Sequence, residues 1–328
     1  MTHDRAEQIN VYNMRYFSYL VVATMIFGTA LTSCKKNDDN QRDWLLETII
    51  VSQYNALSDN VYQVKYVLEY DNKNRITKRI MHNYSHWIDD WGGEISPISL
   101  NYNADGCLVE YDSKWYWRDP WNQTAFFQND NKITFTTTYY HPLGSTNGTI
   151  NGELELNVQG LPVKLTSEHI ESSISYAEIE TRERVINLSY TATLTWQNGN
   201  LTKTIWERED ETLRYIFTDL ESKELVEREE SSSSGTITFT HDEKKTPFYH
   251  CNTPKWFFLW NEKYGFGSNY EYNANNIKTE TIEDGSTITY EYTYNDDGFP
   301  ATRTWGAASI WMEGTTTETY TYKMPAAN

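Results

Sequence analysis

The feature that most constrains this chain is a two-residue alternation of large apolar or aromatic side chains with polar ones. In an extended strand, successive side chains point to opposite faces, so each run places one row of large side chains on one face of a sheet. The positions between them are mostly Thr, Glu, Lys and Ser, which suit the solvent-facing side of a sheet. The alternation predicts an all-β fold. The clearest runs cover residues 62–70, 186–196, 237–239, 288–294 and 320–322.

A short turn motif recurs between these runs. Each copy begins with an aromatic residue, continues with Asn, Asp or Gly, and ends at a residue that starts the next strand. Asn, Asp and Gly tolerate the positive φ that tight hairpin turns need. We therefore predict an antiparallel β-meander of repeated hairpins with few helices, arranged as a twisted or curled sheet, an open barrel or a sandwich. The clearest copies are residues 70–76, 102–108, 196–201, 272–277 and 294–300.

The N-terminus carries the pattern of a bacterial export signal. Residues 16–31 form the only strongly apolar stretch and follow Arg15. The stretch is too short for a transmembrane helix of about 20 residues, but it fits the core of a signal peptide. Asp4 and Glu7 are atypical of a positively charged leader, so the two alternatives are translation from Met1 or from Met14. We predict that residues 1–33 are a signal peptide.

The apolar core ends in Leu31-Thr32-Ser33-Cys34, which resembles the lipobox of bacterial lipoproteins. Cys34 is the predicted lipid attachment site, where acyl chains would anchor the protein to a membrane without spanning it. The residue that follows the cysteine is Lys35 and not Asp. By resemblance to known sorting rules, this implies that the protein is sorted to the outer membrane. We expect residues 34–42 to be a lipid-anchored tether. The body would then lie on the periplasmic face or on the cell surface, and the membrane would be a partner through the anchor only.

Together, the lipobox and the Y-N-x-D-G turns flanked by Y-x-Y strands resemble a family of uncharacterised β-rich Bacteroidota lipoproteins with YD-like hairpin repeats, a domain of unknown function. The resemblance is strongest over residues 270–322. It implies secretion and an all-β body, and it supplies no catalytic residues. We expect residues 43–328 to form one continuous domain with aromatic-rich insertions near 81–126 and 247–267.

Charge and cysteine content narrow the environment. The chain has 46 Asp and Glu against 28 Lys and Arg, a net charge of -18. This balance argues against a nucleic-acid partner, because phosphate binding depends on clustered Lys and Arg. Beyond Cys34 the chain has two cysteines, Cys107 and Cys251. In an oxidising compartment they would form a disulfide, and the alternative is two buried free thiols.

The sequence lacks the short signatures of nucleotide-binding, zinc-protease and serine-hydrolase sites, and it predicts no cofactor. His82 and His86 are four residues apart, but in a strand that separation is about 13 Å, too far for one ion. We therefore predict no metal site. The absence of signatures favours a protein that is not an enzyme. A glycoside hydrolase stays open, because it needs only two suitably spaced carboxylates.

The sharpest functional signal is the clustering of Trp in the two insertions. Flat aromatic faces beside carboxylates are typical of a sugar-binding surface. The alternative interpretation is that these Trp fill the core. The candidate ligand-binding residues are Trp87, Asp89, Asp90, Trp91, Trp115, Trp117, Trp121, Trp256 and Trp260.

Three functions follow, in order of preference. The first is an outer-membrane or surface lipoprotein that acts as an extracellular binding module for a glycan. The second is a structural or protein-interaction lipoprotein without a small ligand. The third is an enzyme similar to a glycoside hydrolase.

Overall fold

A computed structural model describes residues 44–55, 60–85, 90–92, 97–113, 121–140, 146–176, 181–217, 223–260, 273–309 and 312–325. These residues form eighteen strands and one short helix, so the prediction of an all-β, antiparallel meander is confirmed. No helix in this part of the chain is long and apolar enough to cross a lipid bilayer.

The strands of the first half are β1 (Leu45–Asn55), β2 (Asn60–Tyr70), β3 (Ile76–Ser85), β4 (Asp90–Trp91), β5 (Ile98–Tyr102), β6 (Leu108–Ser113), β7 (Trp121–Asn129), β8 (Lys132–Tyr140) and β9 (Thr146–Leu156). The second half contains β10 (Pro162–Tyr176), β11 (Thr181–Gln197), β12 (Asn200–Phe217), β13 (Lys223–Lys245), α2 (Lys255–Trp260), β14 (Asn275–Ile282), β15 (Thr287–Thr289), β16 (Glu291–Tyr294), β17 (Pro300–Ser309) and β18 (Met312–Lys323).

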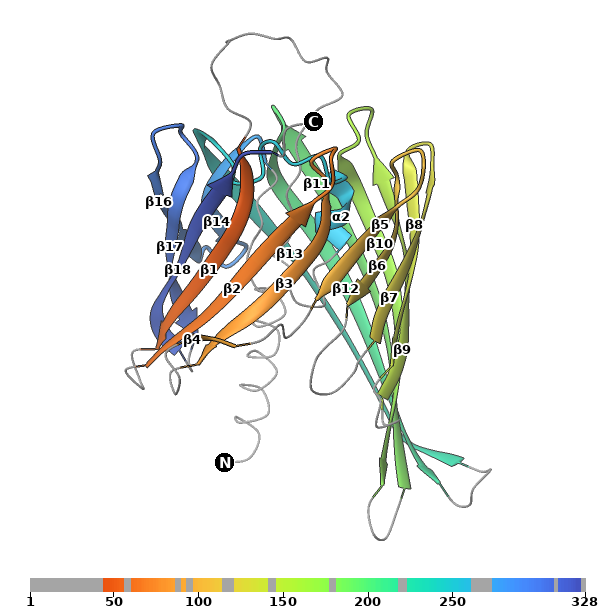
Figure 1. Ribbon diagram of the computed structural model, residues 1–328. Coiled ribbons are helices and arrows are strands. Elements are labelled where there is room, and N and C mark those ends of the chain that lie inside the picture. The colour runs from red at the N-terminus through yellow and green to blue at the C-terminus, as the bar shows by residue number, and fades with distance from the viewer. Residues whose placement is uncertain are drawn as a thin grey trace.

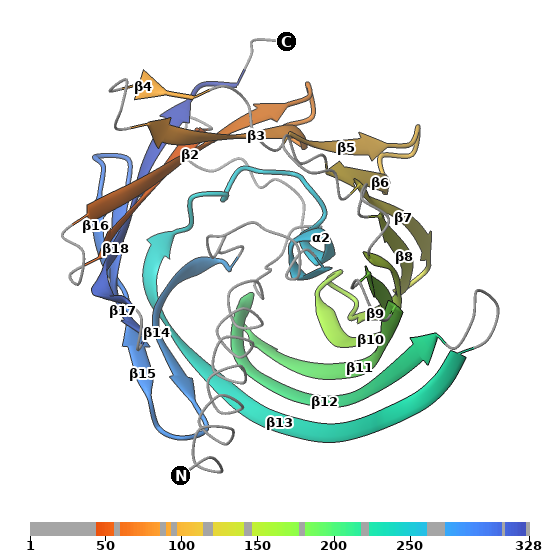
Figure 2. The same cartoon turned by 90° about the horizontal axis from the view of Figure 1, so that it is seen from below.

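The sheet is nearly closed into a barrel (Figures 1 and 2). Neighbouring strands along the chain pair antiparallel, except that β3 pairs with β5 and β4 pairs only with the end of β3. The first and last strands then join, with Ile49 of β1 opposite both Tyr66 of β2 and Tyr320 of β18. The one interruption separates β15 from β16 at Tyr290, whose backbone N–H still donates to the Lys278 carbonyl of β14 (2.9 Å). Of the arrangements predicted, the barrel is the observed one.

Because the strands alternate in direction, the repeated tight turns gather at one end of the barrel, the upper end in Figure 1. We call it the turn end and the opposite end the loop end. In the turn at 103–107, the Asn103 N–H donates to the Cys107 carbonyl and the Cys107 N–H donates to Asn103 Oδ1, both at 2.9 Å. Gly106 has φ +88°, where an L side chain would be strained. The same pattern of bonds closes the turns at 71–75, 157–161 and 295–299.

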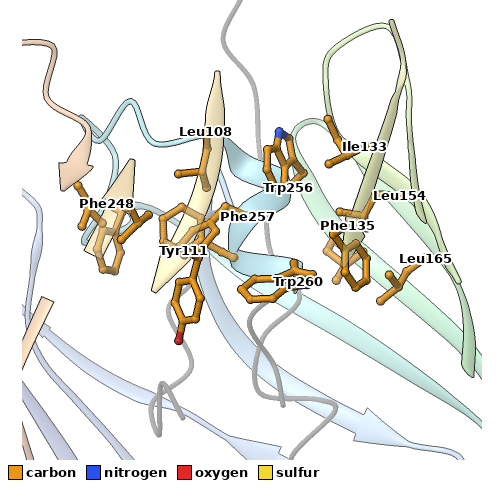
Figure 3. Close-up of a cluster of buried hydrophobic side chains, with 14 of the residues drawn as sticks. Leu108, Tyr111, Ile133, Phe135, Leu154, Leu165, Phe248, Trp256, Phe257 and Trp260 are labelled. Atoms are coloured by element: carbon orange, nitrogen blue, oxygen red, sulfur yellow. The ribbon is translucent and has the colours of Figure 1, made fainter. Parts of the chain in front are cut away.

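The inner wall of the barrel is apolar, and the second aromatic insertion fills part of the interior. Helix α2 lies inside the ring (Figure 2). Its side chains Phe257 (1% exposed) and Trp260 pack on Tyr111 of β6, with ring centroids 6.0 and 5.0 Å away (Figure 3). Trp256 lies 4.9 Å from the Phe126 ring of β7. The helix is therefore an aromatic plug that joins the walls into one core.

The outer wall is polar. Along most strands, the positions that alternate with the buried rows carry hydroxyl or charged side chains, with exposed exceptions such as Phe127, Ile170 and Ile205. Exposed residues at such positions include Lys132, Thr134, Thr136, Thr138, Thr193, Thr195, Glu207, Glu209, Glu291, Thr293 and Thr319.

Strands β10 to β13 continue past the loop end as a four-stranded arm, at the lower right of Figure 1. Ion pairs connect its strands, with Arg228 of β13 pairing with Glu211 of β12 (2.7 Å) and Arg214 of β12 pairing with Glu229 of β13 (3.2 Å). No described strand pairs with the outer edge of β13 between residues 223 and 236.

Candidate ligand-binding surface

An aromatic patch interrupts the polar outer wall at the loop end of β1 to β4. We define the aromatic patch as Tyr54, Val61, Tyr84 and Trp91. Tyr54 and Val61 face each other across β1 and β2, and both are 39% exposed. They occupy outward positions of the alternation, where most of the wall has Thr, Glu or Lys. Both side chains are thus partly accessible to solvent.

Strand β4 positions Trp91 in this patch. Trp91 pairs with Tyr84, and the following Gly92 N–H donates to the Asn83 carbonyl (2.9 Å). The Tyr84 and Trp91 rings meet edge to face, with centroids 5.3 Å apart and an interplanar angle of 74°. The Lys65 ammonium lies 6.0 Å from the Trp91 ring centroid. The ring of Trp91 is thus held in place, half-buried, with a cation beside it.

Neutral hydrogen-bonding groups surround the aromatic patch. Gln63 Nε2 donates to Ser52 Oγ (3.0 Å) on the outer face, between Tyr54 and Tyr84. The Tyr62 hydroxyl donates to Asn83 Oδ1 (3.2 Å) on the opposite, inner face of the wall, so this pair supports the strands behind the patch and does not line it. Flat rings beside amide and hydroxyl groups can stack on the apolar face of a sugar ring and bond its hydroxyls.

The structure describes some of the predicted site residues fully, others only by their strand position, and others not at all. Trp91 is in the patch. Asp90 begins β4 and Trp121 begins β7, which fixes their strand positions but not their side chains. Tyr54 and Tyr84 were missed, because each is an ordinary member of an alternating run and only the register shows that it faces outward. The predicted residues that lie outside the described part of the chain are Cys34, Trp87, Asp89, Trp115 and Trp117.

Two of the predicted ligand-binding residues are corrected. Trp256 (3% exposed) and Trp260 (9% exposed) lie in the aromatic plug, so the core interpretation holds for them. They fill the barrel because α2 lies inside the ring of strands, where its aromatic rings pack against the apolar inner wall. The disulfide alternative is also not what the structure shows, since Cys107 and Cys251 are both free thiols.

A buried charged cluster on the inner wall was also missed. Arg303 of β17 and Glu318 of β18, each 1% exposed, form an ion pair with Nη2 2.7 Å from Oε2. The Tyr320 hydroxyl donates to the same carboxylate oxygen. Nearby, the Tyr290 hydroxyl donates to Glu280 Oε2 (2.8 Å). The sequence signal that could have predicted this cluster is a charged residue at a position where the alternation places buried side chains. Since the cluster is closed to solvent, it belongs to the core.

The arm carries two open grooves. One, of about 850 Å³, is lined by Arg182, Arg184 and Arg214 together with Glu183 and Glu227. The other, of about 680 Å³, is lined mainly by glutamate and serine side chains. Charged side chains distinguish both grooves from the aromatic patch, since the first is lined by both signs of charge and the second by carboxylates without Lys or Arg. Among the described residues, no three His, Cys, Asp or Glu side chains are placed to hold a metal ion.

No protein-family model matches the chain, and no curated protein matches it. Among solved structures, a porin-like protein from Bacteroides uniformis is 14% identical with a TM-score of 0.33, covering 85% of this chain and 98% of that one. A porin-like protein from Bacteroides vulgatus is 13% identical with a TM-score of 0.24, covering 70% of this chain and 94% of that one.

Proposed function

We propose that this chain is a lipid-anchored extracellular binding protein whose aromatic patch binds a glycan. The observation that carries the proposal is the patch itself, because Tyr54, Tyr84 and Trp91 gather aromatic surface on a wall made mostly of hydroxyl and charged side chains. A held Trp ring with neutral amide and hydroxyl groups nearby suits a polar, uncharged ligand with an apolar face, and a sugar ring is such a ligand.

The polar outer wall supports an anchor in place of a membrane span. In a transmembrane β-barrel, the outward side chains form an apolar band about 25 Å tall. Here the outward positions of β8, β11 and β12 carry mostly Thr, Lys and Glu, with Ile205 of β12 as an exposed apolar exception, and the apolar rows face inward. We therefore assign membrane attachment to acyl chains on Cys34 at the outer membrane, with the body on the periplasmic face or the cell surface.

The binding proposal is tested with the exported chain and a panel of soluble polysaccharides. We expect saturable quenching of tryptophan fluorescence with at least one neutral glycan. Trp91→Ala should weaken that affinity about tenfold, the effect of losing one contact of roughly 1.4 kcal/mol. Phe127→Ala is the matched control, because Phe127 is an exposed aromatic residue on another part of the wall. Equal affinities for the two variants, or no binding by the parent protein, would reject the proposal.

The free edge of β13 favours a second candidate, a protein-interaction lipoprotein. An unpaired strand edge can accept an extended segment of another protein. Pairing of this edge with the same edge of a second copy, in full antiparallel register, would place Glu229 of one copy opposite Glu230 of the other. The repulsion between these carboxylates disfavours that pairing. This candidate predicts a protein ligand whose binding is lost in Val226→Pro and kept in Trp91→Ala. A glycan affinity that depends on Trp91 would favour the first candidate instead.

A further inference from the structure

The turn end has a surface that suits a lipid bilayer. Four large apolar side chains are exposed there, although nothing in the turns requires them. Val158 is fully exposed at the tip of the 157–161 turn, and Phe127 is 69% exposed on the outer face of β7, near the turn that joins β7 to β8. Tyr249 contacts Phe299 of the 295–299 turn, with ring centroids 6.5 Å apart, and Met324 directly follows β18. The described turn end thus has apolar tips on opposite sides of the ring.

The turn chemistry singles out Val158. Four turns share one hydrogen-bond pattern, and their second residues are Asn72, Ala104, Val158 and Asp296. This position needs no apolar group, and three of the four turns have a small or polar residue there. The fully exposed Val158 side chain packs on nothing in its own barrel, so it is available to contact an apolar surface outside the barrel.

Cations stand beside the apolar tips. Lys132 of β8 and Lys164 of β10 flank Glu155 of β9, next to the Val158 turn. Lys132 also pairs with Glu153 (2.6 Å). Long lysine stems can lie along an apolar contact while the ammonium reaches outward to lipid phosphates. Lysines on the strands that lead to the Val158 turn are therefore near enough to reach lipid headgroups when the apolar tip contacts the acyl chains.

The chain before the barrel leaves from the same end. Trp44 precedes β1 at the turn end, and its Nε1 donates to Asp297 Oδ2 of the 295–299 turn (2.9 Å). Nine residues lie between Cys34 and Trp44, so the tether reaches at most about 35 Å when fully extended. An anchor at Cys34 therefore keeps the start of β1, at the turn end, within about 35 Å of the bilayer.

We infer that the barrel rests on the membrane with its turn end, where Val158, Phe127, Tyr249 and Met324 contact the lipid interface. The aromatic patch and the arm then point away from the membrane, toward the solvent that carries ligands. This inference rests on the lipid anchor of the proposed function and adds the orientation of the body and the surface that sets it.

The test compares hydrogen exchange of the acylated chain on vesicles of phosphatidylethanolamine and phosphatidylglycerol with that of the Cys34→Ser chain in solution. We expect backbone amides of residues 127–134 and 157–161 to exchange several-fold more slowly on vesicles, and those of residues 223–236 in the arm to be unchanged. Unchanged exchange at the turn end, or slowing at the arm alone, would overturn the inference.

A double variant separates contact from mere proximity. Val158→Ser with Met324→Ser removes two apolar tips. Because less apolar area is then buried against lipid, the vesicle-dependent slowing of exchange should fall by about threefold or more. Leu225→Ser with Val226→Ser removes similar exposed side chains from the arm and should leave the slowing intact. The mass of the exported N-terminus reports acylation independently. An unmodified Cys34 would reject the anchor, whereas an acylated chain without slowing would reject only the orientation.

Discussion

At the scale of single residues, three aromatic side chains lie over glycines on the neighbouring strand. The pairs are Phe135 with Gly152, Tyr139 with Gly148, and Trp206 with Gly235. A Cβ added to Gly152 would lie 2.2 Å from the Phe135 ring and 2.6 Å from the Thr166 carbonyl oxygen. The glycines therefore make room for large rings on the inner wall, and the rings cover backbone that a glycine leaves bare.

Gly152→Ala should lower the free energy of unfolding by roughly 2–3 kcal/mol, because both the ring and a backbone carbonyl must move. Gly306→Ala is the control, since an added Cβ there meets no atom within 4 Å, and its effect should stay within about 0.5 kcal/mol. Urea unfolding of the exported chain measures both. Equal losses in the two variants would contradict the proposed role of the ring.

Burial makes His241 a pH-sensitive residue. Burial lowers its pKa to about 4, against the opposing influence of Asp242, and its Nε2 lies 2.7 Å from Asn273 Nδ2. The unfolded chain, with a histidine pKa of about 6.5, binds a proton that the folded chain does not between these values. Stability is therefore present above about pH 6.5 and is lost as the pH falls toward 4, by up to roughly 3 kcal/mol.

This pH dependence can be measured by urea unfolding at about pH 7 and about pH 4.5. His241→Gln keeps an amide for hydrogen bonding and cannot titrate, so the loss of stability between the two pH values should be smaller in the variant. Carboxylates contribute equally to both proteins, which isolates the histidine. An unchanged pH slope would show that His241 is not the titrating group.

At the scale of elements, the aromatic plug depends on the barrel for its structure. Helix α2 has six residues, too few for a stable isolated helix. Phe257→Ala should cost about 3–5 kcal/mol, because it leaves a cavity among Tyr111, Phe126 and Trp260. Phe127→Ala, the same change at an exposed position, should cost under about 1 kcal/mol. Comparable unfolding midpoints for the two variants would refute the plug as core.

The sequence was sufficient to predict those elements whose chemistry is local. Asn103 and Gly106 specify a hairpin turn through a side-chain bond and a positive φ, and both can be recognised without knowing the fold. The sequence did not predict whether the barrel closes. Closure pairs Ile49 with Tyr320, which are far apart in the chain, and no local sequence pattern indicates that pairing.

The candidate site was predictable only in part, for a related reason. Trp91 was predicted because it lies in a Trp-rich segment. The placement of Tyr54 and Tyr84 depends on which alternate residues of their strands face outward. The register of the closed barrel determines which residues those are. Trp256 was misassigned because a Trp cluster has the same composition in a plug as in a binding surface.

At the scale of the whole molecule, the distribution of polar groups predicts how the protein behaves outside a membrane. A chain that begins at residue 35, without the predicted signal peptide and Cys34, should stay in aqueous solution without detergent, because its outer wall is mostly polar. Ultracentrifugation of cell extracts checks this, with the full-length protein expected in the membrane fraction. Recovery of the shortened chain only in detergent would mean that the wall itself inserts into lipid.

The pairing order of the strands also has a consequence for how the chain folds. Nearly every ladder joins consecutive strands, so the meander can form hairpin by hairpin, each with a short loop to close. The ladder between β1 and β18 is different, because it brings Leu45 to Lys323. Because β1 precedes β18 by most of the chain, it can pair with β2 well before the last strand is available. Until then one edge of β1 is unpaired, and ring closure is the step at which a neighbouring chain competes most directly with the protein's own C-terminus.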